Sequence, residues 1–378
     1  RQGEDPNIKK VNKPAITPIF MNRDTTSAFL REVQASVVAP IEPVFVDFSK
    51  DMSQGTVGKL PLLYKKNETN DIFALQYIYD FGTSEMKDMG IAASYLDYLG
   101  TSDMTAAEIK LAFYNLACNY YISASKDRVV VGLSGLAENM PKAMELLEKV
   151  LADAQPDKEA YDGLVDDILR ARLNDKADQQ ANFRRLQTYT FYGPNNPSNT
   201  ILSEAELRSM APETLLQRIS QLSTLEHRVL YYGPLGMDEV SSTVASLHKV
   251  PENLSPVPDN DVFKLQTVKE NVVYIAPYDA NQIYMITYAS RGDKYDVQKS
   301  PVLNMYNEYF GGGMNSIVFQ EMREARGLAY SAYALAMEPA RLEEPYGYFS
   351  MIATQNDKMI DALTAAVEII NNMPLSEQ

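Results

Sequence analysis

The stretch 309–333 constrains the fold of this chain more than any other, because a triple glycine separates two helical patterns within it. Glycines allow backbone angles that a side chain would exclude, so they end the first helix. Apolar residues at spacings of three and four then predict a second helix, which Gly327 ends. The alternating, aromatic-rich residues 328–334 predict a strand. The three glycines are Gly311, Gly312 and Gly313.

Two side chains near the end of this second helix are candidates for a binding site. Arg323 lies in its last turns, and Tyr330 opens the predicted strand seven residues later, so both could present hydrogen-bond donors to one cleft. The alternative is structural: Arg323 and Arg326 would complement the negative end of the helix dipole. Residue type and spacing alone favour this structural alternative.

The motif as a whole changes that balance. Gly-Gly-Gly-Met, then Phe-Gln-Glu, then Arg-x-x-Arg-Gly-Leu-Ala-Tyr-Ser resembles the C-terminal-half signature of the pitrilysin/insulinase family of zinc peptidases, the inverzincins. The similarity extends from about Lys59 to the end of the chain. The resemblance implies that Arg323 and Tyr330 reach across a chamber to a substrate held at a zinc ion in the N-terminal half. We also assign the triple glycine to substrate binding.

The zinc motif of this family, His-x-x-Glu-His, is absent from the sequence. The chain has two histidines, His227 and His248, and neither has the neighbours that the motif requires. The family's zinc frame falls on residues 90–101, where alanine, leucine and aspartate replace the histidine, glutamate and histidine. These residues are Ala93, Leu96 and Asp97. We therefore expect no metal in this chain, and zinc only in the N-terminal half of the parent protein.

Composition excludes several other classes of protein. The net charge is −15 and no basic run offsets it, so a nucleic-acid partner is not expected. No apolar run approaches the roughly 20 residues that span a bilayer. The single cysteine, Cys118, excludes an intramolecular disulfide. The chain begins at Arg1 without a methionine, which suggests a fragment or a processed product. Family analogy alone suggests the periplasm.

The order of the predicted elements indicates an α+β fold, with an antiparallel sheet and helices packed on one of its faces. Strands are expected at 60–67 and 72–82 around a hairpin turn at 67–70, in a hairpin at 119–136 with its turn at 126–127, and at 227–233. Helices are expected at 84–99, 105–117, 138–154 and 157–189, and from Pro212.

The sequence also repeats itself, which predicts two tandem domains. Apolar residues match in order at an offset of 211 residues (283 − 72), and Gly100 matches Gly311 at the same offset. We expect a proline-rich linker at 1–58, a first inverzincin-like domain at 59–255 and a second, incomplete one at 261–378. The matching pairs are Ile72 and Ile283, Phe73 and Tyr284, Leu75 and Ile286, and Tyr77 and Tyr288.

These observations predict the non-zinc-binding half of a zinc metalloendopeptidase, inactive by itself. Its partners would be the N-terminal half of the same protein and a peptide substrate. Its catalytic residues would be Arg323 and Tyr330. The alternative is a catalytically inactive scaffold of the same fold that binds peptides or proteins. The residues upstream of Arg1 would distinguish the two, because only an active parent needs His-x-x-Glu-His there.

Overall fold

The computed structural model describes residues 26–373 apart from 41, 43–44, 260–262 and 340. The chain forms two compact units, residues 1–48 and 49–378, and each is considered by itself. In the first unit, α1 (Ala28–Ala35) begins at Ser27, whose hydroxyl accepts a hydrogen bond from the Leu30 N–H at 3.1 Å. This helix buries none of its side chains. The short α2 (Phe48–Asp51) lies where the two units meet in the sequence.

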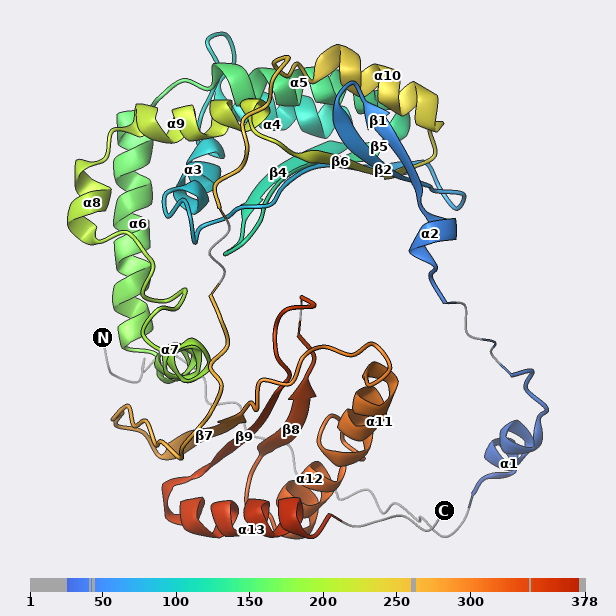
Figure 1. Ribbon diagram of the computed structural model, residues 1–378, viewed down its shortest axis with the longest axis vertical. Helices are drawn as coiled ribbons and strands as arrows, with labels where there is room; N and C mark the ends of the chain where they lie inside the picture. The colour runs from blue at the N-terminus through green and yellow to red at the C-terminus, as the bar shows by residue number, and fades with distance from the viewer. Residues whose placement is uncertain (1–25, 41, 43–44, 260–262, 340, 374–378) are drawn as a thin grey trace, which may run out of the picture. The chain divides into compact units, whose positions relative to one another are not determined.

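The second unit contains a six-stranded sheet in the order β1-β2-β6-β3-β5-β4 (Figure 1). All neighbouring strands run antiparallel except β2 and β6, which run parallel. The predicted α+β class is confirmed. The strands are β1 (Ser53–Val57), β2 (Leu60–Lys66), β3 (Ile72–Tyr79), β4 (Cys118–Ala124), β5 (Val129–Leu136) and β6 (Arg228–Gly233).

Two expectations about this sheet differ from the structure. β1 lies inside the range predicted as a linker, so the sheet begins before Lys59; the sequence hides this strand because Val57 is its one buried residue. The hairpin predicted at 67–70 is wrong. Asn67 does organise a turn there, with its side-chain Nδ2 donating to Asn70 Oδ1 at 2.8 Å. However, β2 and β3 do not pair, because the distant strand β6 lies between them.

Helices pack on one face of this sheet, with α4, α5, α9 and α10 above it in Figure 1. The core lies between the two layers and includes Phe73, Leu75 and Tyr77 of β3, each at most 1% exposed. Burying a side chain of this size contributes about 1.5–3 kcal/mol. The helices are α3 (Met89–Leu96), α4 (Ala106–Asn115), α5 (Met140–Asp153), α6 (Lys158–Lys176), α7 (Gln179–Tyr192), α8 (Glu204–Ser209), α9 (Pro212–Gln221) and α10 (Met237–Leu247), with 3₁₀ turns at 137–139 and 222–224.

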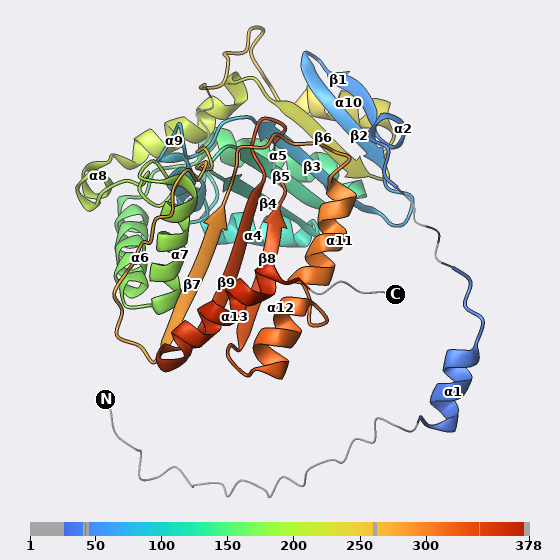
Figure 2. The ribbon, with the colours of Figure 1, turned by 60° about the horizontal axis from the view of Figure 1, so that its bottom comes forward.

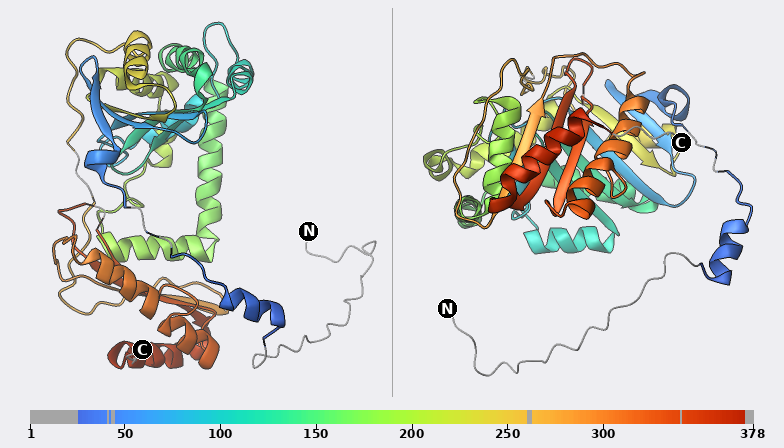
Figure 3. Two further views of the ribbon diagram at one scale, coloured as in Figure 1. Left: turned by 90° about the vertical axis from the view of Figure 1, so that its right-hand side faces the viewer. Right: turned by 90° about the horizontal axis from the view of Figure 1, so that it is seen from below.

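Several helix starts follow from local chemistry. The predicted capping box is confirmed: Thr105 Oγ1 accepts from the Glu108 N–H at 3.3 Å, and Glu108 Oε2 accepts from the Thr105 N–H at 2.8 Å. Pro212 occupies the first turn of α9, also as predicted. The single helix expected at 157–189 is wrong. Asp178 accepts from the Ala181 N–H at 2.6 Å and starts a separate helix, α7, which leaves α6 in a new direction (Figure 3).

A second, three-stranded sheet has the order β7-β9-β8, with both pairs antiparallel (Figure 2). Its core includes Phe310, Met322, Ile352 and Ile369. The strands are β7 (Gln282–Ala289), β8 (Ser331–Met337) and β9 (Gly347–Gln355). The helices are α11 (Ser300–Phe310), α12 (Ile317–Phe319), the π-helix η3 (Gln320–Ala325) and α13 (Met359–Asn371), with a 3₁₀ turn at 356–358.

The two sheets share a topology, since β3-β5-β4 and β7-β9-β8 have the same order along the chain and across the sheet. Backbone hydrogen bonds fix the register of this repeat. The Ala137 N–H donates to the Asp71 carbonyl at 2.9 Å, and the Asn356 N–H donates to the Asn281 carbonyl at 3.3 Å in the same place. Asp71 and Asn281 are 210 residues apart (281 − 71). The predicted offset of 211 is therefore wrong by one residue for β3 and β7.

A one-residue slip matters because it exchanges the two faces of a strand. Leu75 is 1% exposed and faces the helices of its sheet. Its counterpart is Met285, which packs against the core of the second sheet. Ile286, the residue matched from the sequence, lies on the opposite face because neighbouring side chains of a strand alternate.

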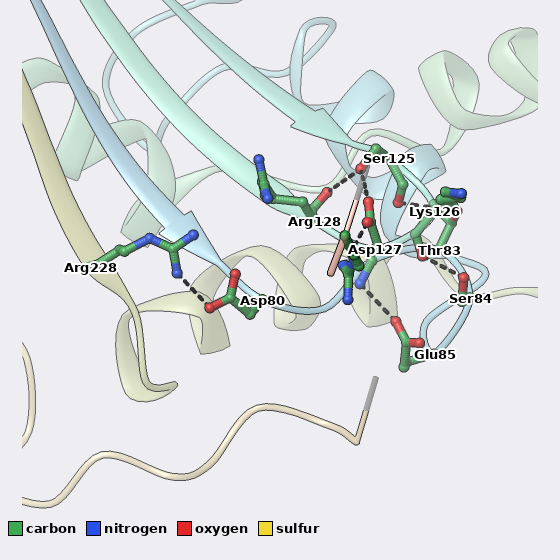
Figure 4. Close-up of polar contacts among 11 residues, drawn as sticks. Asp80, Thr83, Ser84, Glu85, Ser125, Lys126, Asp127, Arg128 and Arg228 are labelled. Carbon is green, nitrogen blue, oxygen red and sulfur yellow. Dashed lines mark hydrogen bonds and ion pairs between the residues drawn. The ribbon is translucent and has the colours of Figure 1, made fainter. Parts of the chain in front are cut away.

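A polar cluster surrounds the turn at 125–128 between β4 and β5, which contains the predicted turn residues 126–127 (Figure 4). Ser84 Oγ donates to the Lys126 carbonyl at 2.5 Å. Asp127 accepts from Ser125 Oγ at 3.1 Å and pairs with Arg341, from the β8–β9 connection, at 2.6 Å. Burial acts to raise the pKa of Asp127, but the hydrogen bonds from Arg341 and Ser125 outweigh it, so the pKa is lowered. This contact ties the second sheet to the first.

Candidate functional site

Arg323 lies in a helical segment with unusual geometry. α12 continues directly into the π-helix η3, whose last hydrogen bond runs from the Arg326 N–H to the Glu321 carbonyl at 3.2 Å. Gly327 has φ +57°, a left-handed conformation that favours glycine, and it ends the helix as the sequence predicts. π-Helical turns are rare and are frequently found at functional sites, which agrees with the prediction of a site at Arg323.

The structure brings the two predicted catalytic side chains into contact. The Arg323 guanidinium carbon lies 4.6 Å from the centre of the Tyr330 ring and 4.9 Å from the centre of the Phe319 ring. Both distances are within the range of cation–π interactions. Arg323 Nε also lies 3.4 Å from Glu324 Oε1, a long surface contact. The Phe319 and Tyr330 rings thus hold the Arg323 guanidinium in place.

Both side chains are accessible to a ligand. Tyr330 is 75% exposed, and among the described residues its hydroxyl has no hydrogen-bond partner. The side chain of Arg323 is 37% exposed. A phenol hydroxyl and a guanidinium are both hydrogen-bond donors, so this pair suits an acceptor that carries negative charge.

Arg326, the neighbouring cation, is placed differently. Its guanidinium lies 2.8 Å from Glu368 Oε2 of α13 and 3.4 Å from Glu321 Oε2 of its own helix. The pair with Glu368 fastens the end of η3 to α13. The structural role that the sequence left open for both arginines therefore fits Arg326, whereas Arg323 points its charge at aromatic rings.

The triple glycine has three different environments. A Cβ on Gly311 would lie 2.1 Å from the Ala334 carbonyl oxygen of β8, so this position needs glycine for close packing. A Cβ on Gly312 would lie 2.8 Å from the Asn307 carbonyl oxygen. Around Gly313 nothing comes within 3.4 Å of such a Cβ. Packing accounts for Gly311 and Gly312, and substrate binding by the three glycines stays a prediction.

The positions that correspond to the zinc motif lie on α3 and at its end. Ala93 and Leu96 are buried in the core at 8% and 1% exposure, and Asp97 is an exposed residue at the helix C-terminus. Neither alanine nor leucine has an atom that binds a metal. Within the described ranges, no group of three or more histidine, cysteine, aspartate or glutamate side chains is arranged to hold a metal ion.

Sequence analysis missed a buried polar chain formed by the two histidines. His227 Nε2 and His248 Nε2 lie 3.0 Å apart, and both residues are at most 7% exposed. His248 Nδ1 lies 2.8 Å from Glu148 Oε1 on α5, which also accepts a hydrogen bond from the Tyr77 hydroxyl at 3.0 Å. The Leu225 carbonyl lies 2.7 Å from His227 Nδ1. No local spacing could reveal this chain, because its members come from four separate elements.

The geometry determines where protons lie in this chain. His227 Nδ1–H donates to the Leu225 carbonyl, so neutral His227 presents Nε2 as an acceptor, and His248 Nε2–H donates to it. The pKa of His227 is lowered to about 4, chiefly by burial; the Leu225 carbonyl and Glu148 act to raise this pKa, and the nearby His248 acts to lower it.

We expect this histidine to make the protein less stable in acid. Histidine in an unfolded chain has a pKa near 6.5. Between pH 6.5 and about 4, residue 227 therefore binds a proton in the unfolded chain but stays neutral in the folded protein. The free energy of unfolding should therefore decrease as the pH is lowered from 6.5 to about 4, by up to about 3 kcal/mol. Urea unfolding at pH 7, 5.5 and 4.5 measures the effect. His227→Gln should lose this part of the slope, and an unchanged slope in that variant would contradict the assignment.

Comparison with known proteins supports a family assignment. Residues 229–377 match the family model described as the peptidase M16 inactive domain. A search of curated protein sequences finds no significant match. No helix in the described part of the chain is both long and apolar enough to cross a membrane.

Solved structures share the fold at low sequence identity. The peptidase M16 inactive domain from Pseudomonas fluorescens is 16% identical with a TM-score of 0.66, and the match covers 86% of this chain and 80% of that one. The periplasmic protease PqqL from Escherichia coli is 12% identical with a TM-score of 0.68, covering 92% of this chain and 41% of that one. The ferredoxin protease FusC, solved in complex with Arabidopsis ferredoxin, gives the same values.

This chain spans less than half of the length of PqqL and of FusC. At these identities the structures establish the fold, and the family model adds sequence evidence over the region that contains Arg323 and Tyr330. Residues 229–377 match the model of the peptidase M16 inactive domain and the solved structures share the fold, so the predicted resemblance of the chain to the C-terminal half of a pitrilysin/insulinase-family peptidase is confirmed.

Proposed function

We propose that this chain is the non-zinc-binding half of a zinc metalloendopeptidase, and that it closes a peptide-binding chamber and supplies Arg323 and Tyr330 to the scissile carbonyl. The observation that carries the proposal is the contact between these two side chains, with the guanidinium 4.6 Å from an exposed tyrosine ring. Arg326 pairs with Glu368 of α13 at 2.8 Å, whereas the carboxylate beside Arg323, Glu324 at 3.4 Å, belongs to the adjacent residue.

The chemistry of the pair fits the transition state of peptide hydrolysis. When water attacks the carbonyl, negative charge develops on its oxygen, and preorganised donors aimed at that oxygen stabilise it. The Tyr330 hydroxyl and the Arg323 guanidinium are such donors, and the flanking Phe319 ring limits the rotamers that Arg323 can adopt. The zinc-bound water and the general base would come from the N-terminal half, through His-x-x-Glu-His.

The remaining assignments complete the proposal. The proposed division is a linker near 1–58, a first domain to about 255 and a second domain from 261 onwards. Because β1 belongs to the first sheet, the first domain begins at about Ser53. The substrate would be a peptide or protein; the similar protease FusC has been solved with a ferredoxin. The similar PqqL is described as periplasmic, which makes the periplasm the proposed compartment.

Reconstitution tests the proposal. The chain alone should not cleave an unstructured reporter peptide. Mixing it with the upstream half of the same protein should produce cleavage that is lost when the histidines of the upstream zinc motif are replaced. If the upstream half has no His-x-x-Glu-His, or if the mixture binds peptide without cleaving it, the alternative of an inactive binding scaffold replaces the proposal.

A further inference from the structure

The connection between η3 and β8, residues 327–329, determines how Arg323 and Tyr330 lie relative to each other. Arg323 directly follows Met322 in η3, and Tyr330 directly follows the connection. Because Tyr330 is 75% exposed, little packing restrains its ring, and the direction of the ring depends on the backbone on either side of it. The contacts that hold the connection therefore decide where the Tyr330 hydroxyl points.

The two peptides of this connection use their N–H groups to bond to the helix. The Leu328 N–H and the Ala329 N–H both donate to the Met322 carbonyl, at 2.9 and 3.3 Å. Gly327, with φ +57°, reverses the chain so that both groups reach this carbonyl, as left-handed residues commonly do at helix ends. Since Met322 is the neighbour of Arg323, these bonds tie the connection to the helical turn that carries the guanidinium.

The carbonyl groups of the same two peptides bond in the opposite direction. The Leu328 carbonyl accepts from Thr354 Oγ1 at 2.5 Å, and the Gly327 carbonyl accepts from Lys358 Nζ at 3.2 Å. The N–H and C=O groups of a trans peptide point away from each other. Each of the two peptides is therefore held on both sides, by Met322 through its N–H group and by a side chain through its carbonyl.

Thr354 is a buried residue of β9, the central strand of the second sheet (Figure 2). It is 4% exposed and shares a face of the strand with Ile352 of the core, because alternate residues of a strand point the same way. A hydroxyl buried in this way needs a hydrogen-bond partner, which the connection provides. The neighbouring Ala353 opposes Ser331, the residue after Tyr330. β9 thus holds the chain both before and after Tyr330.

We propose that Thr354 and Lys358 are positioning residues for Tyr330. By holding two successive carbonyls of the connection, they keep the Tyr330 hydroxyl beside the Arg323 guanidinium, so that both donors meet one acceptor oxygen. The inference rests on the proposed function, in which these two donors stabilise an oxyanion. Donors that are aimed in advance need no reorganisation when charge develops. A displacement of about 1 Å from the productive geometry can cost on the order of 100-fold in rate.

Replacing Thr354 by valine keeps the shape of the side chain and removes its hydroxyl. In the reconstituted enzyme, Thr354→Val should lower kcat about tenfold and change KM less than about twofold, because substrate still binds while the phenol is less well placed. Thr354→Ser retains a hydroxyl and should restore kcat. Ser350→Ala is the matched control, because it removes a 7% exposed hydroxyl on the same face of β9, whose partner is Thr287 of β7. Its kcat should be unchanged.

A double-mutant cycle separates positioning from a general loss of stability. If Thr354 acts through the Tyr330 hydroxyl, adding Thr354→Val to Tyr330→Phe should lower kcat no further. A further fall of about tenfold in the double variant would overturn the proposal, because the two changes would then act independently. Equal kcat values for Thr354→Val and Ser350→Ala would overturn it as well.

Hydrogen exchange in the chain alone tests the placement without relying on catalysis. Thr354→Val should speed exchange at the Ala329 amide by about tenfold, because the carbonyl of the same peptide loses its partner. Lys358→Met keeps the apolar stem and should speed exchange at the Leu328 amide by about threefold, since its bond is longer and exposed. Ser350→Ala should change neither amide.

The two measurements fail in different ways. Unchanged exchange at both amides would overturn the positioning role, and Lys358→Met keeps this test available if Thr354→Val does not fold. If the amides respond but Tyr330→Phe leaves kcat unchanged, the connection is held as inferred and the proposed function fails instead.

Discussion

Replacing Tyr330 by phenylalanine should lower kcat of the reconstituted peptidase by about 100-fold to 1,000-fold, the usual cost of removing one preorganised donor to an oxyanion. The melting temperature should stay within a few degrees, because the residue is 75% exposed and its ring, which contacts Arg323, remains. The effect should fall on kcat and on kcat/KM together, since the lost hydrogen bond forms in the transition state. Steady-state kinetics on a reporter peptide, with a thermal unfolding scan, measure both quantities.

The two arginines of the same helix provide the control. Arg323→Ala should reduce kcat in the same way. Arg326→Ala should chiefly lower the melting temperature, because it breaks the contact between η3 and α13 at Glu368. If Tyr330→Phe leaves kcat unchanged, or if it unfolds the chain, the tyrosine has a structural role and the proposed mechanism fails at that residue.

Elements set by local chemistry were predictable from the sequence. The capping box of Thr105 and Glu108, the first-turn position of Pro212 and the hairpin turn at 126–127 each depend on residues within a few positions of one another. Gly327 ends its helix in a left-handed conformation that favours glycine. In each case the sequence signal and its structural cause lie in the same short segment.

Features that depend on distant segments were not predictable. β6 enters the sheet between β2 and β3, and no signal near the turn at 67–70 reports a strand that arrives so much later in the chain. The repeat offset was misjudged by one residue because β7 carries tyrosine and isoleucine on its outward face, so apolar identity matched the wrong face. His227 and His248 meet only through the packing of α10 and α5 around β3.

The residues of the candidate site were predictable from the sequence, but the contacts that hold Arg323 in place were not. The spacing of Arg323 and Tyr330 implied a common cleft, and the structure places them in contact. The stacking of Arg323 on Phe319 was not foreseen, because it depends on the side-chain directions within a helix that changes from α to π geometry at Gln320. Such a change has no sequence signal comparable to a cap or a glycine stop.

Gly311→Ala should destabilise the second sheet, whereas Gly313→Ala should not. A Cβ at position 311 would lie 2.1 Å from the carbonyl oxygen and 2.5 Å from the nitrogen of Ala334, inside the hydrogen-bonded contact between the end of α11 and β8. Backbone atoms cannot move aside as a flexible side chain can, so the end of α11 must shift. Overpacking of this kind typically costs about 1–3 kcal/mol. Urea unfolding of the full chain measures the loss for each variant.

The same pair of variants separates the two roles that the triple glycine could have. If Gly313 approaches the substrate, Gly313→Ala should raise KM of the reconstituted enzyme without changing the unfolding midpoint, because a Cβ there meets nothing within 3.4 Å in the free chain. A Gly313→Ala enzyme with unchanged KM would restrict the glycines to packing. A Gly311→Ala chain as stable as the original would show that α11 and β8 are not held as closely as the structure places them. The stability of the 311 variant therefore tests the fold, and the KM of the 313 variant tests the site.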